Sequence, residues 1–160
     1  MVEILVGMIA SGKSTYARKR AVDGAVIIND DAIVNAVHPN YLLYDKKLKP
    51  LYKSVENTIL QMAIALGRDV IIDRPNYSRA MRRRYIGIAK SLDATVHMIV
   101  FPKASPKEHA RRRTASDDRG HCFEYWLKAA RHHNNLYEPP INSEGADCII
   151  IANETGDEAE

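Results

Sequence analysis

The sequence has few cysteines and no long apolar run, and these absences exclude several classes of protein. Its 160 residues include two cysteines, Cys122 and Cys148, with no CxxC spacing. We expect free thiols in a reducing cytoplasm rather than a disulfide framework or a cysteine metal site. No apolar segment approaches the roughly 20 residues that span a bilayer. The apolar stretch 2–6 is too short for a signal peptide and lacks its basic start.

The sequence also contains no internal repeats and no low-complexity tract. Its composition is that of an ordinary globular protein. Hydrophobic residues make up 46% and charged residues 27% of the chain. This length and composition predict one domain over residues 1–151. We expect residues 152–160 to form an acidic, frayed tail. The expected location is the cytoplasm (the host cytoplasm for a phage-encoded chain), with no membrane and no protein partner implied.

The net charge of +3 hides an uneven distribution. The last nine residues carry four acids and no base, so the rest of the chain carries +7. Such an excess favours polyanionic partners, either nucleotide phosphates or a nucleic-acid backbone. The alternative is that about half of the arginines lie on solvated helix surfaces. The arginines gather in two groups: Arg74, Arg79, Arg82, Arg83 and Arg84, then Arg111, Arg112, Arg113 and Arg119.

Short continuous apolar runs alternate with helical patterns along the chain. Within 48–66, for example, apolar residues recur at the spacing of an amphipathic helix. They are Leu51, Tyr52, Val55, Ile59, Met62, Ala63 and Leu66. Continuous rather than alternating apolar strands predict an α/β fold with a five-stranded, mostly parallel sheet and helices on both faces. The expected strands are 3–6, 25–28, 70–72, 95–101 and 148–151, and the expected helices are 13–21, 32–37, 48–66, 78–92, 106–113 and 123–137.

A phosphate-binding loop follows the first strand. Residues 7–14 match GxxxxGK[ST] in full, between a predicted strand and a predicted helix. In this motif, backbone N–H groups and the positive end of the helix dipole hold phosphates. Lys13 would reach the β- and γ-phosphates of ATP, and Ser14 would hold Mg²⁺. The predicted ATP-binding residues are Gly7, Ala10, Ser11, Gly12, Lys13, Ser14 and Thr15.

Other classes of nucleotide-binding protein lack support. Motor ATPases usually carry a glutamate beside the aspartate that ends a strand, but Asp73 is followed by Arg74. GTPases need an NKxD motif, and none is present. The segment 117–120 matches the loose pattern DxxG away from a strand end, which we interpret as chance. Elimination leaves a kinase.

Three acids end predicted strands at the carboxyl edge, where ligands bind in open parallel sheets. Asp30 or Asp31 could accept the proton of an acceptor hydroxyl, or one of them could cap the following helix. Asp73 could support the Mg²⁺ shell through water or contact the acceptor, or it could be a plain turn residue. Residues 113–121 resemble a closing lid that brings Arg113 and Arg119 over the phosphates, with a plain polar loop as the alternative.

Together these residues resemble the 5′-kinase domain of bacteriophage-type polynucleotide kinases and related small P-loop kinases, over nearly the whole chain. The resemblance implies that Asp30 is the general base, that Lys13 and Arg119 are catalytic, and that Arg113 and Arg119 hold the ATP phosphates. It also implies an acceptor site. The segments that carry it are 7–15, 28–31, 71–76, Arg113, 119–120, 137–140 and 144–145, and the acceptor-binding residues are Asp31, Asp73, Arg74, Asn76 and Arg79.

Two positions differ from that family. Its acceptor-binding arginine lies three residues after the base, where this chain has Ile33, and Asn29 stands where arginine is frequent. Arg74, Arg79 or Arg82 are candidates to supply the missing cation. Alternatively, the acceptor is the hydroxymethyl group of a modified base in DNA, as for some related phage kinases.

Three functions remain open. The first is an ATP- and Mg²⁺-dependent kinase acting on a polynucleotide hydroxyl, with DNA favoured as the nucleic-acid partner. The second is a kinase of the same fold acting on a small metabolite or nucleoside. The third is a non-catalytic nucleic-acid-binding module that ATP switches.

Overall fold

The computed structural model describes residues 1–39, 43–117 and 119–153. Asp118 of the predicted lid and residues 154–160 of the predicted tail lie outside the described residues. Both cysteines are free and exposed, as predicted. Over the part of the chain that is described, no helix has the length and apolarity to traverse a bilayer.

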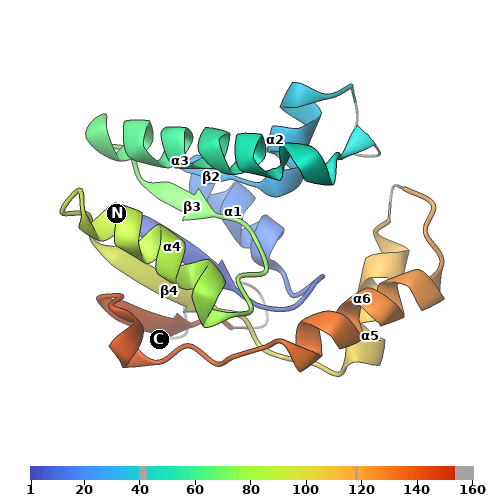
Figure 1. Ribbon diagram of the computed structural model, residues 1–160. Helices are drawn as coiled ribbons and strands as arrows, with labels where there is room; N and C mark the ends of the chain where they lie inside the picture. Colours follow the sequence, from blue (N-terminus) through green and yellow to red (C-terminus); the bar gives the residue numbers. More distant parts are fainter. Residues whose placement is uncertain (40–42, 118, 154–160) are drawn as a thin grey trace.

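Five strands form one sheet in the order β2-β3-β1-β4-β5, and each neighbouring pair runs parallel (Figure 1). Parallel strands covered on both faces must be apolar throughout, and β1 and β3 are buried along their whole length. The predicted fold class is therefore confirmed. The strands are β1 (Val2–Val6), β2 (Val26–Ile28), β3 (Val70–Ile72), β4 (Val96–Val100) and β5 (Cys148–Ile151).

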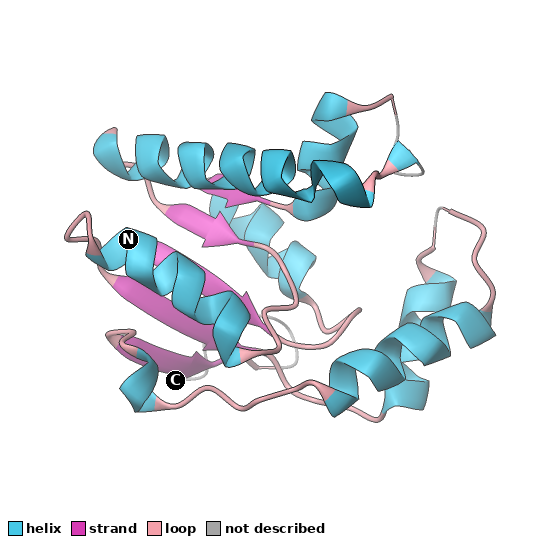
Figure 2. Ribbon diagram, viewed as in Figure 1, coloured by secondary structure: helices cyan, strands magenta, loops and turns pink. Residues whose placement is uncertain are grey.

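Helices connect the strands and cover both faces of the sheet (Figures 1 and 2). One face packs against α2, α3 and α4 through the larger apolar cluster, and the other packs against α1. The pair α5 and α6 packs together beyond the carboxyl edge of the sheet. The helices are α1 (Lys13–Ala21), α2 (Asp30–Val37), α3 (Lys49–Ala65), α4 (Arg79–Lys90), α5 (Pro106–Ala115) and α6 (Phe123–Asn135), with 3₁₀ turns η2 (Lys46–Leu48) and η3 (Asn142–Glu144).

The start of α2 differs from the prediction. Asn29, rather than Asp30 or Asp31, is the cap: its Oδ1 accepts a hydrogen bond from the backbone N–H of Ala32 at 3.1 Å. The amide of Asn29 also donates to the backbone oxygen and to Oδ2 of Asp73, at 3.1 and 3.2 Å. Asn29 therefore performs the capping, and the two aspartates of the first turn keep their carboxylates for other contacts.

Candidate active site

The phosphate-binding loop leaves the carboxyl end of β1 and turns into α1. Gly12 is the N-cap of α1 in the left-handed region, with φ 98°, a conformation that glycine adopts without steric cost. At Gly7 a Cβ would lie 2.7 Å from Ser11 Oγ and 3.0 Å from Phe101 Cβ. The close approach of the loop to its own side chains therefore requires glycine at this position.

Lys13 lies inside the curve of this loop. Its Nζ donates to the carbonyl oxygens of Met8 and Gly7, at 2.5 and 3.2 Å, and to Ser11 Oγ at 3.2 Å. The side chain is buried, and this burial lowers the pKa of Lys13 to about 8 although Asp73 favours the charged form. The ammonium group is thus held at the centre of the loop. A bound anion there would raise the pKa of Lys13 again and keep its side chain charged.

A cleft of about 900 Å³ opens beside the loop and collects most of the predicted site. Its lining comes from the phosphate-binding loop, the ends of β2 and β3, and the pair α5–α6. Gly7 supports the loop from behind without lining the cleft. The predicted residues that line it are Ala10, Ser11, Gly12, Lys13, Ser14, Thr15, Asp30, Asp31, Asp73, Arg74, Arg113 and Arg119.

Asp30 lies at the border of this cleft and is paired with Arg74. Burial and the hydrogen-bonded, negatively charged Glu56 raise the pKa of Asp30 to about 8, although Arg74 favours its ionised form. Glu56 is buried and bridges two arginines: Arg74 Nη1 lies 2.7 Å from its Oε1 and Arg84 Nη1 2.8 Å from its Oε2. The carboxyl group of Asp30, whose side chain is 41% exposed, therefore lies at the open end of a network that reaches the buried Glu56. Its pKa lies near the range where general bases work.

The second aspartate of α2 has a different partner. Asp31 pairs with Arg119, which follows α5 and precedes α6. This ion pair joins α2 to the loop that was predicted to be a lid. Arg119 thus lies on the cleft, and its guanidinium contacts a carboxylate in this structure.

Aromatic side chains of α6 form the wall of the cleft together with the end of α5. Tyr125, Trp126 and His133 line it, and the guanidinium of Arg113 lies 4.5 Å from the ring centroid of Trp126. The rings of Tyr77 and His133 are 4.8 Å apart at 33°. Burial lowers the pKa of His133 to about 4, so this ring is neutral near pH 7. The wall therefore offers flat, uncharged rings close to two arginines.

Two predicted acceptor-binding residues lie elsewhere. Asn76 is fully buried, and its amide donates to the backbone oxygens of Leu5, Ile72 and Arg74 at 2.8, 3.3 and 3.2 Å. The structure gives no support for its predicted contact with the acceptor, because its amide N–H groups join the ends of β1 and β3. Arg79 is exposed on α4 and does not line the cleft, so the structure gives no support for its predicted role.

Arg82 is also excluded as the missing cation. Its side chain is fully buried and makes a bidentate pair with Glu144, with both N···O distances 2.7 Å. Its Nη1 donates to the backbone oxygen of Asn76 at 2.9 Å. Of the three candidate arginines, only Arg74 lies beside Asp30.

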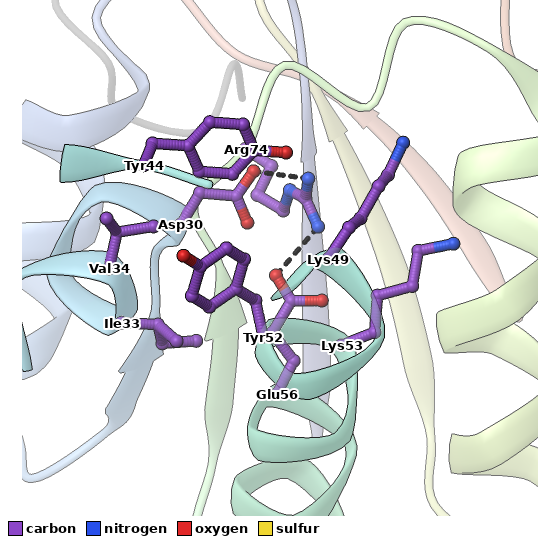
Figure 3. A pocket seen from close by; sticks show the side chains of 9 residues that line it. All are labelled: Asp30, Ile33, Val34, Tyr44, Lys49, Tyr52, Lys53, Glu56 and Arg74. Atoms are coloured by element: carbon purple, nitrogen blue, oxygen red, sulfur yellow. Dashed lines mark hydrogen bonds and ion pairs between the residues drawn. The ribbon is translucent and has the colours of Figure 1, made fainter. Parts of the chain in front are cut away.

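The sequence analysis missed a second, smaller pocket of about 100 Å³ on the other side of Asp30 (Figure 3). Asp30 and Arg74 border both cavities. Glu56 and Tyr52 are buried, and the Tyr52 hydroxyl lies 2.7 Å from Nε2 of His38. The remaining lining residues are Ile33, Val34, Tyr44, Lys49 and Lys53. The signal that could have found this pocket is the recurrence of polar residues at 49, 52, 53 and 56 on one face of α3.

Metal-binding groups are sparse. Among the residues that the structure describes, no three histidine, cysteine, aspartate or glutamate side chains gather as a metal site. Ser14 and Asp73 both line the cleft beside the phosphate-binding loop. Mg²⁺ bound to nucleotide phosphates needs only one or two protein ligands, since phosphates and water supply the others. Ser14 and Asp73 fit that requirement.

The comparisons with known proteins concern the family and the fold of the chain. The profile of a family described as an AAA domain matches residues 2–137. No curated protein matches. A candidate kinase from Chloroflexus aurantiacus has a similar fold, with TM-score 0.70 and 16% identity over 96% of this chain and 85% of that one.

Two further solved structures share the fold. A chain of the Pnkp1/Rnl/Hen1 RNA repair complex gives TM-score 0.66 and 20% identity over 86% of this chain, which spans 46% of that one. APS kinase from Mycobacterium tuberculosis, in complex with AMPPNP and APS, gives TM-score 0.64 and 13% identity over 96% of this chain and 90% of that one. These TM-scores support a P-loop kinase-like fold, and the low identities leave the acceptor open.

Proposed function

The chain belongs to the AAA domain family, and from this premise we propose that it is an ATP-dependent kinase that transfers the γ-phosphate to a hydroxyl of a polynucleotide. The observation that carries the proposal is the position of Asp30, which borders both the cleft of the phosphate-binding loop and the adjoining pocket. A carboxylate between a triphosphate site and an acceptor pocket is the arrangement that phosphoryl transfer to an alcohol requires.

The residues divide the chemistry between them. Asp30 accepts the proton of the acceptor hydroxyl while the hydroxyl oxygen bonds to the γ-phosphorus and the bond to the departing ADP oxygen breaks. Lys13 offsets the charge on the β- and γ-phosphates. Arg119 would leave Asp31 and contact the transferring phosphoryl group, as predicted for a lid arginine. Mg²⁺, held through Ser14 and Asp73, would neutralise phosphate charge when bound.

The cleft beside the phosphate-binding loop favours a polynucleotide acceptor over a small metabolite. Its wall combines the rings of Tyr125, Trp126 and His133 with Arg113 and Arg119, and single-stranded nucleic acid binds to such mixtures of aromatic and cationic side chains. The acceptor is a 5′-hydroxyl end or the hydroxymethyl group of a modified base in DNA.

A small-metabolite or nucleoside kinase is the second candidate, and one observation favours it. The pocket beyond Asp30 is only about 100 Å³, room for a small acceptor group. A non-catalytic module switched by ATP is a third reading, which a requirement for the Asp30 carboxylate would exclude.

The test is an acceptor panel with γ-labelled ATP and Mg²⁺. The panel contains a 5′-hydroxyl DNA oligonucleotide, the matching RNA, DNA with hydroxymethyluracil, and nucleosides and sugars. We expect label on one of the polynucleotides, with turnover that falls as salt rises. Label on a nucleoside or sugar alone, with little salt dependence, would replace the proposal with the second candidate. Labelling of no acceptor, with ATP still bound, would leave the third.

A further inference from the structure

We infer that the pocket beside Asp30 binds an acceptor that carries a phosphate near its reacting hydroxyl, and that Lys49 and Lys53 contact this phosphate. The inference rests on the proposed function, since it takes Asp30, which borders the pocket, as the base. It specifies which part of the acceptor the enzyme recognises. None of the sequence motifs includes either lysine.

The two lysines belong to one face of α3. Lys49, Tyr52, Lys53 and Glu56 follow one another at the i, i+3, i+4 and i+7 positions, which lie on the same side of a helix, and all four line the pocket. Figure 3 shows the lysine side chains extending in the same direction along one rim, with their ammonium groups apart from the carboxylates of Asp30 and Glu56. The pocket therefore presents two carboxyl groups with the Arg74 guanidinium between them and aromatic rings beside them, and the two lysines form a cationic rim.

The acids inside the pocket have partners without the lysines. Arg74 pairs with both Asp30 and Glu56, and Glu56 also pairs with Arg84. Neither carboxyl group therefore needs a lysine as its counter-ion. Within the described residues neither lysine side chain forms an ion pair, so the rim carries two positive charges that the fold itself does not compensate. An anionic group of the ligand would do so.

The size of the pocket limits what enters it. A cavity of roughly 150 Å³ holds one benzene ring, and this pocket of about 100 Å³ is smaller. It admits the hydroxyl-bearing end of an acceptor and leaves the rest at the rim, beside the lysines. The recognised class is therefore an alcohol with a phosphate mono- or diester a few bonds from the hydroxyl, whether in a polynucleotide or a phosphorylated small molecule.

The test compares two double variants for binding. Lys49→Ala/Lys53→Ala removes the rim charges, and Lys46→Ala/Lys47→Ala removes two exposed lysines of η2 that do not line the pocket. Fluorescence anisotropy measures binding of a 3′-labelled, 5′-hydroxyl trinucleotide with a non-hydrolysable ATP analogue present. We expect the rim variant to bind about tenfold more weakly, since exposed charge contacts are modest, and the slope of log K against log salt to fall by about 1.4, at roughly 0.7 per contact. The control variant should match the wild type.

Competition separates recognition of phosphate from general attraction. Thymidine 3′-phosphate should displace the trinucleotide about tenfold better than thymidine from the wild type, and equally well from the rim variant. A duplex with hydroxymethyluracil is assayed in parallel. The inference would be overturned if the two double variants had equal effects or if neither had any effect. It would also be overturned if neither the trinucleotide nor the hydroxymethyluracil duplex bound to the wild type. Lysine-dependent binding without phosphate transfer to any acceptor would instead refute the proposed kinase activity and leave the phosphate site standing.

Discussion

Replacing Asp30 by Asn should remove phosphoryl transfer while leaving the nucleotide site intact. Asn keeps the shape of the side chain but cannot accept the acceptor's proton. General-base catalysis contributes roughly 10²–10⁴-fold, so we expect kcat to fall by about that factor. Asp30 contacts Arg74 rather than the phosphate-binding loop, so the Kd for ATP should stay within about threefold of the wild type. Initial rates with labelled ATP and calorimetric titration with ATP measure the two quantities.

The pH profile provides a more specific signature. Because the pKa of Asp30 is raised to about 8, only about a tenth of the carboxyl groups are ionised at pH 7. With ATP saturating, so that its phosphates keep Lys13 charged, the kcat/KM for the acceptor should therefore rise about tenfold between pH 7 and 9. Asp30→Asn should abolish this rise, while Asp31→Asn, which changes the neighbouring acid, should keep it. A profile that is flat in the wild type, or a rise that persists in Asp30→Asn, would refute the assignment of the base.

Stability separates this effect from misfolding. The pKa of Asp30 in the folded chain lies above its ordinary value of 3.8, so between about pH 4 and 8 the folded state binds more protons at this group than the unfolded state. Its contribution to stability is present below that window and declines as the pH rises through it. Asp30→Asn should therefore melt at the same temperature as the wild type or higher at pH 8. A lower Tm would indicate that the Arg74 pair dominates instead.

Three further substitutions test the loop, the lid and the core. Gly7→Ala would bring a Cβ within 2.7 Å of Ser11 Oγ in the loop. This substitution should lower the free energy of unfolding by about 1–3 kcal/mol and weaken ATP binding in calorimetry. The control is Gly87→Ala, where a Cβ meets nothing within 4 Å, and it should be neutral or stabilising. Arg119→Ala should lower kcat about 10²-fold in the transfer assay with little change in Tm, and an unchanged kcat would argue against a catalytic lid. Glu144→Gln leaves the buried Arg82 without a charged partner and should cost about 3–5 kcal/mol in urea unfolding, while the acceptor KM of the folded protein stays constant.

Local signals predicted the fold and the phosphate site because their determinants are close in sequence. The loop 7–14 is one continuous segment, and the apolar runs before it and before Asp30 and Asp73 place all three at one edge of the sheet. The cap of α2 was the exception within this set. Asn29 and the two aspartates after it are all good caps, and the contact of Asn29 with Asp73, 44 residues away, favours Asn29.

The buried face of α3 shows where local reasoning stops. Of the apolar residues with amphipathic spacing, Tyr52 and Ala63 are each 6% exposed, as the pattern predicts. Leu51, Met62 and Leu66 are 45%, 55% and 71% exposed, however, whereas Glu56 is 2% exposed. Glutamate is rarely buried unless it is paired, and the partners of Glu56 come from the end of β3 and from α4. A pattern within one helix contains no information about such partners. The same limitation hid the pocket that α3 lines.

The cation beside Asp30 illustrates the difference between position in sequence and position in space. The resemblance to polynucleotide kinases expects an arginine three residues after the base, on the same helix, where this chain has Ile33. Ile33 is buried in the wall of the small pocket, and Arg74 reaches Asp30 from the end of β3 instead. A guanidinium group at this place needs only to meet the carboxylate and the acceptor, so either element can supply it.

If Arg74 performs that role, Arg74→Lys should weaken acceptor binding because an ammonium group cannot bridge two carboxylates with a planar fork. Placing arginine at 33 in that variant should restore part of the affinity only if the two sites are equivalent in space.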